Sequence, residues 1–327
     1  MDALVTGEAG GIDALQPATV DTPTPAADEV RVEVQAVSLN PVDYKLLESG
    51  HEDWTYPHVP GVDAAGVVDE VGADVTDWQE GDAVYYHGNL ARDGTFAEYV
   101  TAPAHVLAPM PATLSFEEAA AIPCAGFTAY QALYRRLGIG SGETILVHGG
   151  SGGVGGYAVQ LANRAGLDVY TTCSPENDEF ARGLGANVTI DYKSEDPVKR
   201  VLELTDGRGV DHVVDTVGGE SPTEALDALA FGGGLACILN LPDAESRRES
   251  EKALSVHKIM LGGAHLNGDY WAQVDLARMG REMGQLLANG DLDPMVGEII
   301  SFDGIPDALG RLSRGETPSG KVVARLK

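Results

Sequence analysis

Residues 150–155 read GSGGVG, a run whose glycines follow the spacing G-x-G-x-x-G. The run comes directly after an apolar stretch at 144–148, which predicts a β-strand, and before residues 157–162, which predict a helix. In that context the glycines allow a tight turn, and the backbone amides at the helix start can bind a pyrophosphate. We therefore predict a dinucleotide-binding loop with contacts from Gly150, Ser151, Gly152, Gly153, Val154 and Gly155.

The same segment also fits a second chemistry. Residues 149–153 read GGSGG, the pattern of an esterase nucleophile elbow, for which His257 or His265 could supply the later histidine. An elbow normally follows several strands of its sheet, whereas this segment follows the first predicted strand, so dinucleotide binding is favoured. Residues 315–321 imitate a phosphate-binding P-loop, but Val322 replaces the magnesium-binding hydroxyl and a strand follows. We interpret that segment as a turn.

The choice of cofactor depends on the residue that follows the second predicted strand. Ser174 stands about 20 residues beyond the glycine loop, where an NAD enzyme places an acid on the ribose hydroxyl. A neutral hydroxyl does not repel a 2′-phosphate, so Ser174 favours NADPH over NADH. The nearby acids Asp168 and Glu176 are interpreted as a strand start and the first turn of the next helix.

The pattern of apolar residues changes near residue 123. Before it, short alternating runs such as 30–34 and 64–68 predict a mainly antiparallel, partly barrel-like domain. Between 123 and 264, strand-like runs alternate with helices, which predicts an α/β fold with a doubly wound parallel sheet. We expect 265–327 to return to the first domain, giving one domain from 1–122 with 265–327 and another from 123–264. Ser115 and Glu118 form a capping-box pattern at a short helix.

The charge balance excludes some functions. The chain has 50 acidic and 22 basic residues, a net charge of −28, and no basic stripe that could neutralise nucleic-acid phosphates. The acids are scattered, so we expect a folded acidic surface adapted to high salt, as in a halophile. No run reaches the roughly 20 apolar residues of a membrane helix, and no signal sequence is visible, so we expect a cytoplasmic protein. Three scattered cysteines predict neither disulfides nor a closed zinc site.

Several separate segments resemble one family. Together with the glycine loop, the segments 38–44, 60–66, 122–129 and 213–219 resemble the zinc-free quinone oxidoreductases of the medium-chain dehydrogenase/reductase superfamily. The resemblance implies a GroES-like catalytic domain and a Rossmann domain. Zinc-dependent relatives carry metal ligands at positions that match Asn40, then Val62 with Asp63, then Cys124. Two usual ligands are replaced and the four-cysteine structural loop is missing, so we expect no bound metal.

The resemblance also implies where each group of site residues lies. It assigns the substrate oxygen and its proton to Asn40, Asp43, Tyr44 or Lys45, where Lys45 replaces a tyrosine of some relatives. Asn40 and Asp43 could alternatively brace a turn after Pro41. The remaining implied contacts are with the cofactor: nicotinamide with Thr128 and Asn240, adenosine with Ser174, Asn177 and Tyr192, and further contacts from Lys193 and Val217. Many relatives have a Lys at position 177, and Lys193 could compensate for its absence. We interpret His148 as a core histidine satisfied by its neighbours.

The implied activity is hydride transfer from NADPH to a quinone or similar conjugated carbonyl, which needs no strong Lewis acid. Two alternatives stay open: an enone or enal reductase of the same family, and a sensor that binds NADPH without turnover. Relatives of this kind pair through an edge strand, here expected at 259–263, so we also predict a homodimer.

Overall fold

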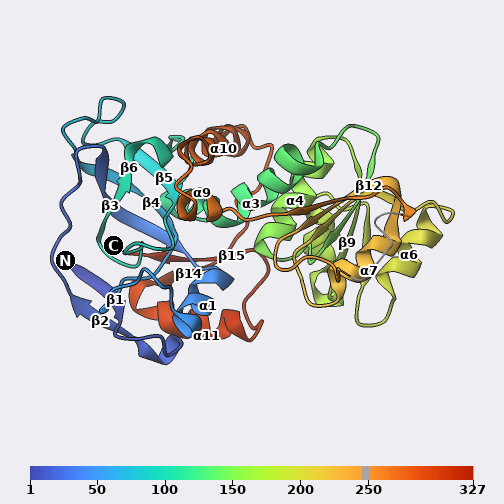
Figure 1. Ribbon diagram of the computed structural model, residues 1–327, viewed down its shortest axis with the longest axis horizontal. Coiled ribbons are helices and arrows are strands. Elements are labelled where there is room, and N and C mark those ends of the chain that lie inside the picture. The colour runs from blue at the N-terminus through green and yellow to red at the C-terminus, as the bar shows by residue number, and fades with distance from the viewer. Residues whose placement is uncertain (245–250, 327) are drawn as a thin grey trace. The chain divides into compact units, whose positions relative to one another are not determined.

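The computed structural model describes residues 1–244 and 251–326. The chain divides into two compact units (Figure 1). Unit 1 consists of Met1–Phe127 and Gly262–Lys327, and unit 2 consists of Thr128–Leu261. The sequence analysis placed the two boundaries at 122/123 and 264/265, and the structure places them at 127/128 and 261/262.

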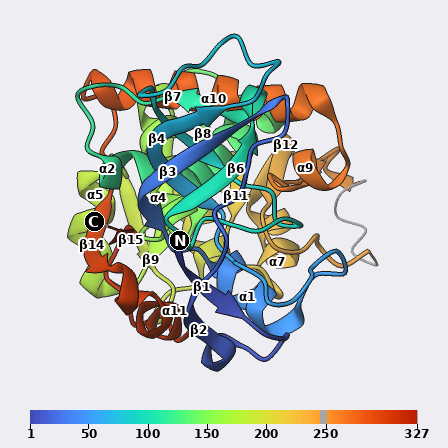
Figure 2. The same cartoon turned by 90° about the vertical axis from the view of Figure 1, so that its left-hand side faces the viewer.

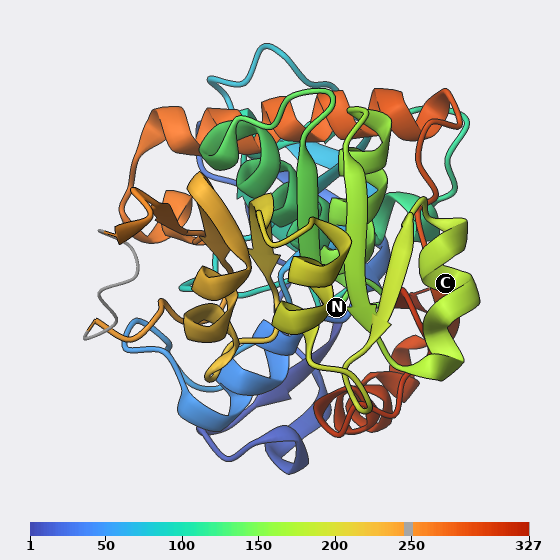
Figure 3. The same ribbon diagram turned by 90° about the vertical axis from the view of Figure 1, so that its right-hand side faces the viewer.

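Unit 2 contains a six-stranded parallel sheet with the order β10-β9-β8-β11-β12-β13 (Figure 3). Its strands are β8 (Thr144–His148), β9 (Asp168–Cys173), β10 (Val188–Asp191), β11 (Val210–Asp215), β12 (Leu229–Cys237) and β13 (Ser255–Lys258). This order reverses between β8 and β11, which is the switch point where such sheets bind ligands. The predicted doubly wound parallel sheet is therefore confirmed.

The helices of unit 2 connect these strands. They are α3 (Thr128–Tyr130), α4 (Gly153–Arg164), α5 (Asp178–Gly183), α6 (Pro197–Leu204) and α7 (Ser221–Ala228), with a π-helical turn at Gln131–Leu137 and a 3₁₀ turn at Pro175–Asn177. Apolar side chains of the strands and of α6 and α7 form a buried core that includes Leu146, Val213 and Leu235. Burial on both faces explains why these strands read as continuous apolar runs.

Unit 1 is built around a seven-stranded sheet with the path β14-β15-β3-β4-β5-β7, in which β6 also pairs with β3 (Figure 2). The strands are β3 (Glu29–Ser38), β4 (Asp63–Val71), β5 (Ala83–His87), β6 (Tyr99–Pro103), β7 (Ala108–Pro109), β14 (Val296–Ser301) and β15 (Lys321–Arg325). All pairs are antiparallel except β14 with β15. A separate two-stranded sheet joins β1 (Asp2–Thr6) and β2 (Leu15–Thr19). The predicted mainly antiparallel, GroES-like architecture is confirmed.

Helices and short turns complete unit 1. They are α1 (Pro41–Ser49), α2 (Phe116–Ala120), α9 (Gly263–Leu266), α10 (Tyr270–Ala288) and α11 (Ile305–Ser313), with 3₁₀ turns at Ile12–Ala14, Ala104–Val106 and Phe302–Gly304 and a π-helical turn at Pro123–Phe127. The predicted capping box begins α2: Glu118 N donates to Ser115 Oγ at 3.2 Å, and Ser115 N donates to Glu118 Oε2 at 2.8 Å. Two orphan amides at the helix start are thereby satisfied.

One predicted strand was wrong. The edge strand of the parallel sheet is β13 (Ser255–Lys258), not the apolar run at 259–263. Ile259 N still donates to Cys237 O at 2.9 Å, but the chain then leaves the sheet and enters α9 after Gly262. Ile259 and Leu261 are buried outside any strand, so their apolar character reflects packing and not pairing. Among residues 1–244 and 251–326, no helix is both long and apolar enough to cross a bilayer.

Candidate active site

The glycine loop between β8 and α4 requires glycine for steric reasons. A Cβ on Gly150 would lie 2.0 Å from Thr171 Oγ1, and one on Gly155 would lie 2.1 Å from Gly149 O. Gly149 N donates to Thr172 Oγ1 at 3.0 Å, which fixes the loop against β9. Helix α4 then begins after Gly152, which has no side chain to cap the first amides. These amides can therefore bind a phosphate.

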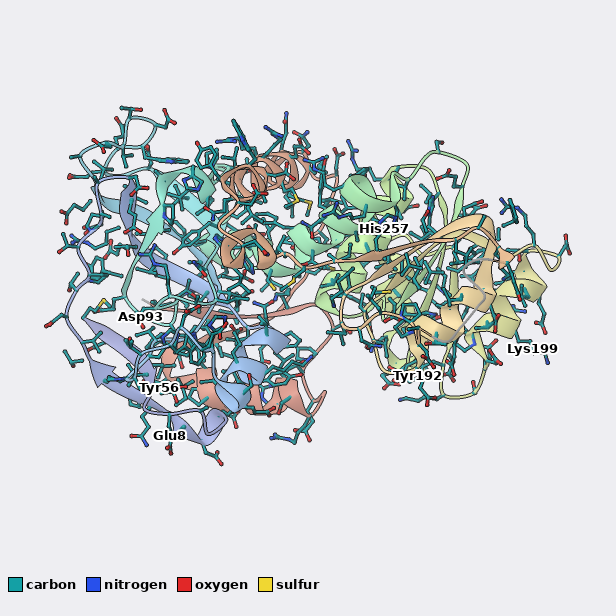
Figure 4. The ribbon with its side chains drawn as sticks, in the orientation of Figure 1. Glu8, Tyr56, Asp93, Tyr192, Lys199 and His257 are labelled. Carbon is teal, nitrogen blue, oxygen red and sulfur yellow. The ribbon has the colours of Figure 1, made fainter. Side chains whose placement is uncertain are left out.

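Neutral polar groups gather beside this loop at the end of β9. The side-chain amide of Asn177 donates to Ser174 Oγ at 3.1 Å and to Ser151 Oγ at 3.2 Å. The structure thus brings two predicted adenosine-side residues, Ser174 and Asn177, together with Ser151 of the glycine loop. Lys193 Nζ lies 3.2 Å from Glu176 Oε1 in an exposed ion pair, and the Glu176 carboxylate also accepts a hydrogen bond from Ser174. Tyr192 is 54% exposed (Figure 4).

The residues predicted to contact nicotinamide have different surroundings. Thr128 is buried at the start of α3, and Val217 is exposed after β11. Both ends of the Asn240 side-chain amide form hydrogen bonds with the backbone. Nδ2 donates to Gly219 O at 2.9 Å, and Oδ1 accepts from Gly219 N at 2.8 Å. In this arrangement Asn240 braces the turn after β11.

His148, at the end of β8, belongs to a buried polar group. Its Nδ1 lies 2.9 Å from Asp215 Oδ2 and 2.7 Å from Ser221 Oγ, whereas its buried Nε2 has no partner among the described residues. Burial raises the pKa of Asp215, but hydrogen bonds from His148, Ser221 and Gly218 N outweigh it and hold that pKa below its usual range. The interpretation of His148 as a satisfied core histidine is right for one ring nitrogen only.

Unit 1 contains a second buried polar group, centred on Asn40. The Asn40 amide nitrogen donates to Asp63 Oδ2 at 2.8 Å and to Ser38 O at 3.2 Å. Lys321 Nζ donates to Asn40 Oδ1 at 2.5 Å and to Leu39 O at 2.9 Å. Both amide hydrogens of Asn40 are therefore used inside the protein. Asn40 holds Asp63 and Lys321 in place, and it does not offer a hydrogen to a substrate oxygen.

Asp43 lies in the first turn of α1 and carries an unusual carboxyl group. Asn40 N donates to its Oδ2 at 2.7 Å, but its buried Oδ1 has no partner among the described residues. Burial, and then the neighbouring Asp63 carboxylate, raise the pKa of Asp43 to about 8. Asp43 is therefore a neutral acid near pH 7, with a proton that it can donate.

Asp63 differs from Asp43 because it has more donors around it. Besides the Asn40 amide, Ser38 Oγ and Cys124 N donate to its two oxygens, each at 2.9 Å. Burial raises the pKa of Asp63, and the Lys321 ammonium and these donors oppose the rise. One buried ammonium serves two buried carboxyl groups, so Asp63 carries the negative charge and Asp43 keeps the proton.

The two residues after Asp43 point in other directions, because successive residues of a helix do not share a face. Tyr44 is partly exposed and Lys45 is exposed, whereas Asp43 is only 2% exposed. Burial, and then Glu48, raise the pKa of Tyr44, so the phenol keeps its proton and can donate a hydrogen bond. The structure therefore brings Asn40 and Asp43 together and separates Lys45 from them.

A possible metal-binding group lies beside this site. Ligand atoms of Asp63, His87 and Cys124 all lie within 4.8 Å of one another. His87 is 2% exposed, its Nδ1 has no partner in the described part of the chain, and burial lowers its pKa to about 4. Burial, followed by the Asp63 carboxylate, raises the pKa of the Cys124 thiol.

These three donors are of kinds that zinc accepts, but their surroundings do not suit the ion. A metal would have to compete with the three hydrogen bonds on Asp63 and lie near the Lys321 ammonium. In the arrangement that the structure describes, the hydrogen bonds on Asp63 and the nearby Lys321 ammonium oppose a zinc ion at this group.

Sequence reasoning missed His87 and Lys321. Lys321 opens the apolar run of β15, and a charged residue that starts a buried strand could have been recognised as a candidate. His87 ends β5 without any motif around it. Only the pairing of β4 with β5, which places Asp63 opposite His87, reveals its position.

Comparison with known proteins agrees with this geometry. Residues 26–112 match the alcohol dehydrogenase GroES-like domain family, and residues 153–289 match the zinc-binding dehydrogenase family. A zinc-type alcohol dehydrogenase-like protein of Schizosaccharomyces pombe is 31% identical over 99% of this chain and 98% of its own. The quinone oxidoreductase of Homo sapiens is 27% identical over 100% of this chain and 98% of its own.

Solved structures of related proteins have the same fold. The quinone oxidoreductase of Pseudomonas syringae pv. tomato superposes with a TM-score of 0.88 at 30% identity, over 99% of each chain. The match at 26–112 lies in unit 1, the match at 153–289 runs from unit 2 into α10 of unit 1, and the full-length relative is 31% identical. The chain belongs to the medium-chain dehydrogenase/reductase superfamily, and its relatives there include quinone oxidoreductases.

Proposed function

We propose that this protein is an NADPH-dependent, zinc-independent oxidoreductase that transfers hydride to a quinone or a similar conjugated carbonyl. One observation carries the proposal: the buried group of Asn40, Asp63 and Lys321 leaves Asp43 as a neutral acid. The site thus offers a proton but no strong Lewis acid. A conjugated carbonyl can use such a site, because its electron-poor carbon accepts hydride when it is well positioned.

When bound, NADPH supplies the hydride. The chain's own residues hold the cofactor and handle the proton. The amides at the start of α4 bind the pyrophosphate. The hydroxyl groups of Ser151 and Ser174 and the Asn177 amide donate hydrogen bonds to the 2′-phosphate. Asp43 is the source of the proton that the oxygen of the reduced acceptor takes up. Tyr44 supplies a hydrogen bond to that oxygen.

The preference for NADPH rests on neutral donors at the end of β9. Ser151, Ser174 and Asn177 are neutral, and the Glu176 carboxylate, which accepts a hydrogen bond from Ser174, is also paired with Lys193. The exposed ion pair of Lys193 with Glu176 adds no net charge nearby. We therefore expect a moderate preference and not an absolute one.

Zinc independence rests on the hydrogen bonds around Asp63. We expect full activity after treatment with a chelator, and less than stoichiometric zinc by elemental analysis. Any activity that His87→Ala or Cys124→Ser loses should then not come from loss of a metal, because the wild-type protein keeps its activity on chelation. One zinc per chain, together with loss of activity on chelation, would show that the donor set of Asp63, His87 and Cys124 does hold a metal.

The decisive experiment follows the oxidation of NADPH with a benzoquinone, an enone and an enal as acceptors, in 0.1 M and 3 M potassium chloride. Steady turnover with the quinone supports the proposal. Turnover with only the enone or the enal would assign the reductase activity to those acceptors. NADPH binding without turnover by any acceptor would point to a sensor and would refute the proposed reaction.

A further inference from the structure

A small cavity lies behind the carboxyl group of Asp43. It encloses about 10 Å³ and is lined by Asp43, Trp54, His58 and Arg92, together with Leu46, Pro60, Gly61, Val62, Asn89 and Leu90. A cavity of this volume has room for about one water molecule. Asp43 has a buried oxygen, Oδ1, with no partner among the described residues. A water molecule in this cavity can therefore connect Asp43 to a second titratable group in the wall, His58.

His58 is held rigidly between this cavity and the surface. Its side chain is 3% exposed, and its ring stacks on Trp54 at 3.9 Å between centroids with an angle of 18°. Trp54 is fixed in turn because its Nε1 donates to Leu90 O at 2.8 Å. His58 Nδ1 lies 3.2 Å from Asp93 Oδ1, and the Asp93 side chain is 70% exposed (Figure 4). The imidazole thus joins a buried cavity to an exposed carboxylate.

A larger cavity lies on the outer side of His58. It has a volume of about 520 Å³, and His58, Arg92 and Asp93 line it together with Asp21, Asp53 and Tyr99. His58 and Arg92 therefore form part of the wall of both cavities. The Arg92 guanidinium is paired with Glu29, so among these shared residues His58 is the one that can take up and release a proton.

We propose that His58 relays protons from the outer cavity to Asp43, with Asp93 orienting the imidazole and a water molecule in the small cavity completing the path. The inference rests on the proposed function. Hydride from NADPH adds to a carbon of the quinone ring, the oxygen that gains the electron pair takes up the proton of Asp43, and a shift of a ring C–H proton to the second oxygen gives the hydroquinone. His58 then returns a proton to the Asp43 carboxylate and recovers one from solvent, so NADPH, one proton and quinone give NADP⁺ and hydroquinone.

The surroundings of Asp43 leave few other routes. Asp43 is 2% exposed, so solvent does not reach it directly. Lys321 directs its ammonium at Asn40 Oδ1 and Leu39 O, and Asn40 directs its amide at Ser38 O and Asp63. The charged groups near Asp43 are Asp63 and Lys321 on that side, and Arg92 with Glu29 and Asp93 on the cavity side. Among the described residues, His87 on the Asp63 side has no partner for its Nδ1, whereas His58 on the cavity side is paired with the exposed Asp93.

The test compares His58→Gln and His58→Ala with a matched control, His105→Gln. His105 is another partly buried histidine of unit 1, with its Nε2 2.7 Å from Gln273 Oε1 and no part in either cavity. Steady-state kinetics with NADPH and benzoquinone give kcat and KM for each variant. Solvent deuterium isotope effects and isotope effects with 4-deuterated NADPH then separate proton delivery from hydride transfer.

We expect both His58 variants to lower kcat by about 10- to 100-fold with little change in KM, because a general acid that cannot be reprotonated limits turnover. The solvent isotope effect should rise, and the effect of deuterated NADPH should fall toward 1. Imidazole should partly restore His58→Ala, since the outer cavity can admit it. His105→Gln should behave like the wild type. NADPH titration checks that each variant is folded.

Three outcomes would overturn the relay. The first is an unchanged kcat and unchanged isotope effects in folded His58→Gln. The second is a loss of activity in His58→Ala that imidazole does not restore and that leaves both isotope effects unchanged. The third is a wild-type protein that turns over none of the acceptors, which refutes the proposed function and removes the reaction that the relay serves. In the first two outcomes the wild type is active, so the proposed function stands and only the relay fails.

Discussion

Asp43→Asn replaces an ionisable carboxyl group with an amide of nearly the same shape, and its effect on stability can be worked out from the structure. The amide oxygen can still accept the hydrogen bond from Asn40 N, which is 2.7 Å long in the wild type. The ordinary pKa of Asp is 3.8, and the pKa in the folded protein is about 8. Because each pKa unit corresponds to about 1.4 kcal/mol, the difference is worth at most about 6 kcal/mol.

The sign follows from proton binding. A carboxyl group whose pKa is raised by folding contributes its full stability below pH 4, and this contribution is lost as the pH rises toward 8 and beyond. The wild type should therefore lose stability across that window relative to Asp43→Asn. The variant should be about equally stable at pH 4 and more stable by several kcal/mol at pH 9, up to the limit of about 6 kcal/mol.

Urea denaturation at pH 4, 7 and 9 in constant potassium chloride measures this difference. The control is Asp303→Asn, which changes an exposed carboxyl group of the same unit. Curves of unfolding free energy against pH that run parallel for wild type and Asp43→Asn would refute the reasoning, because they would show that folding does not raise the pKa of Asp43. The proton donor is also removed, so activity should fall while stability rises.

Four further predictions concern other parts of the molecule. Lys321→Met leaves the Asp63 carboxylate buried without its cation, which should cost about 3–5 kcal/mol of unfolding free energy in urea. Ser174→Asp places a negative charge beside the 2′-phosphate and should weaken NADPH binding at least about tenfold, by fluorescence titration, while NADH binding changes little. With a net charge of −28, the melting temperature should be clearly higher in 3 M than in 0.1 M potassium chloride, and equal values would contradict the salt adaptation. Light scattering in 3 M potassium chloride should give the mass of a dimer, paired through the edge strand β13.

The sequence predicted most reliably where one local pattern determines the structure. The glycine loop could be recognised because Gly150 and Gly155 lie where no Cβ fits, and this steric demand is visible as spacing. The Ser115 capping box was right for the same reason, since both partners lie within one turn. The run at 259–263 misled because burial and strand pairing give similar apolar runs.

Contacts between distant segments could not be predicted in this way. Lys321 meets Asn40 across 281 positions, and only the pairing of β15 with β3 brings them together. Asn40 was expected at the substrate oxygen, but the type of residue does not reveal that its amide hydrogens are used by Ser38 and Asp63. Asn240 shows the same limit, because its partner, the backbone of Gly219, carries no side-chain signal.

The placement of Lys321 has a consequence for synthesis on the ribosome. Unit 2 is one continuous stretch, Thr128–Leu261, so it can fold as soon as it has emerged. Unit 1 cannot, because Asp43 and Asp63 are made early and their cation arrives only with residue 321. Residue 321 follows residue 127 by 194 positions, or roughly 10–40 s of translation at typical rates. During that interval both carboxyl groups of the nascent chain must stay hydrated. The core of unit 1 can form only after β15 has been synthesised.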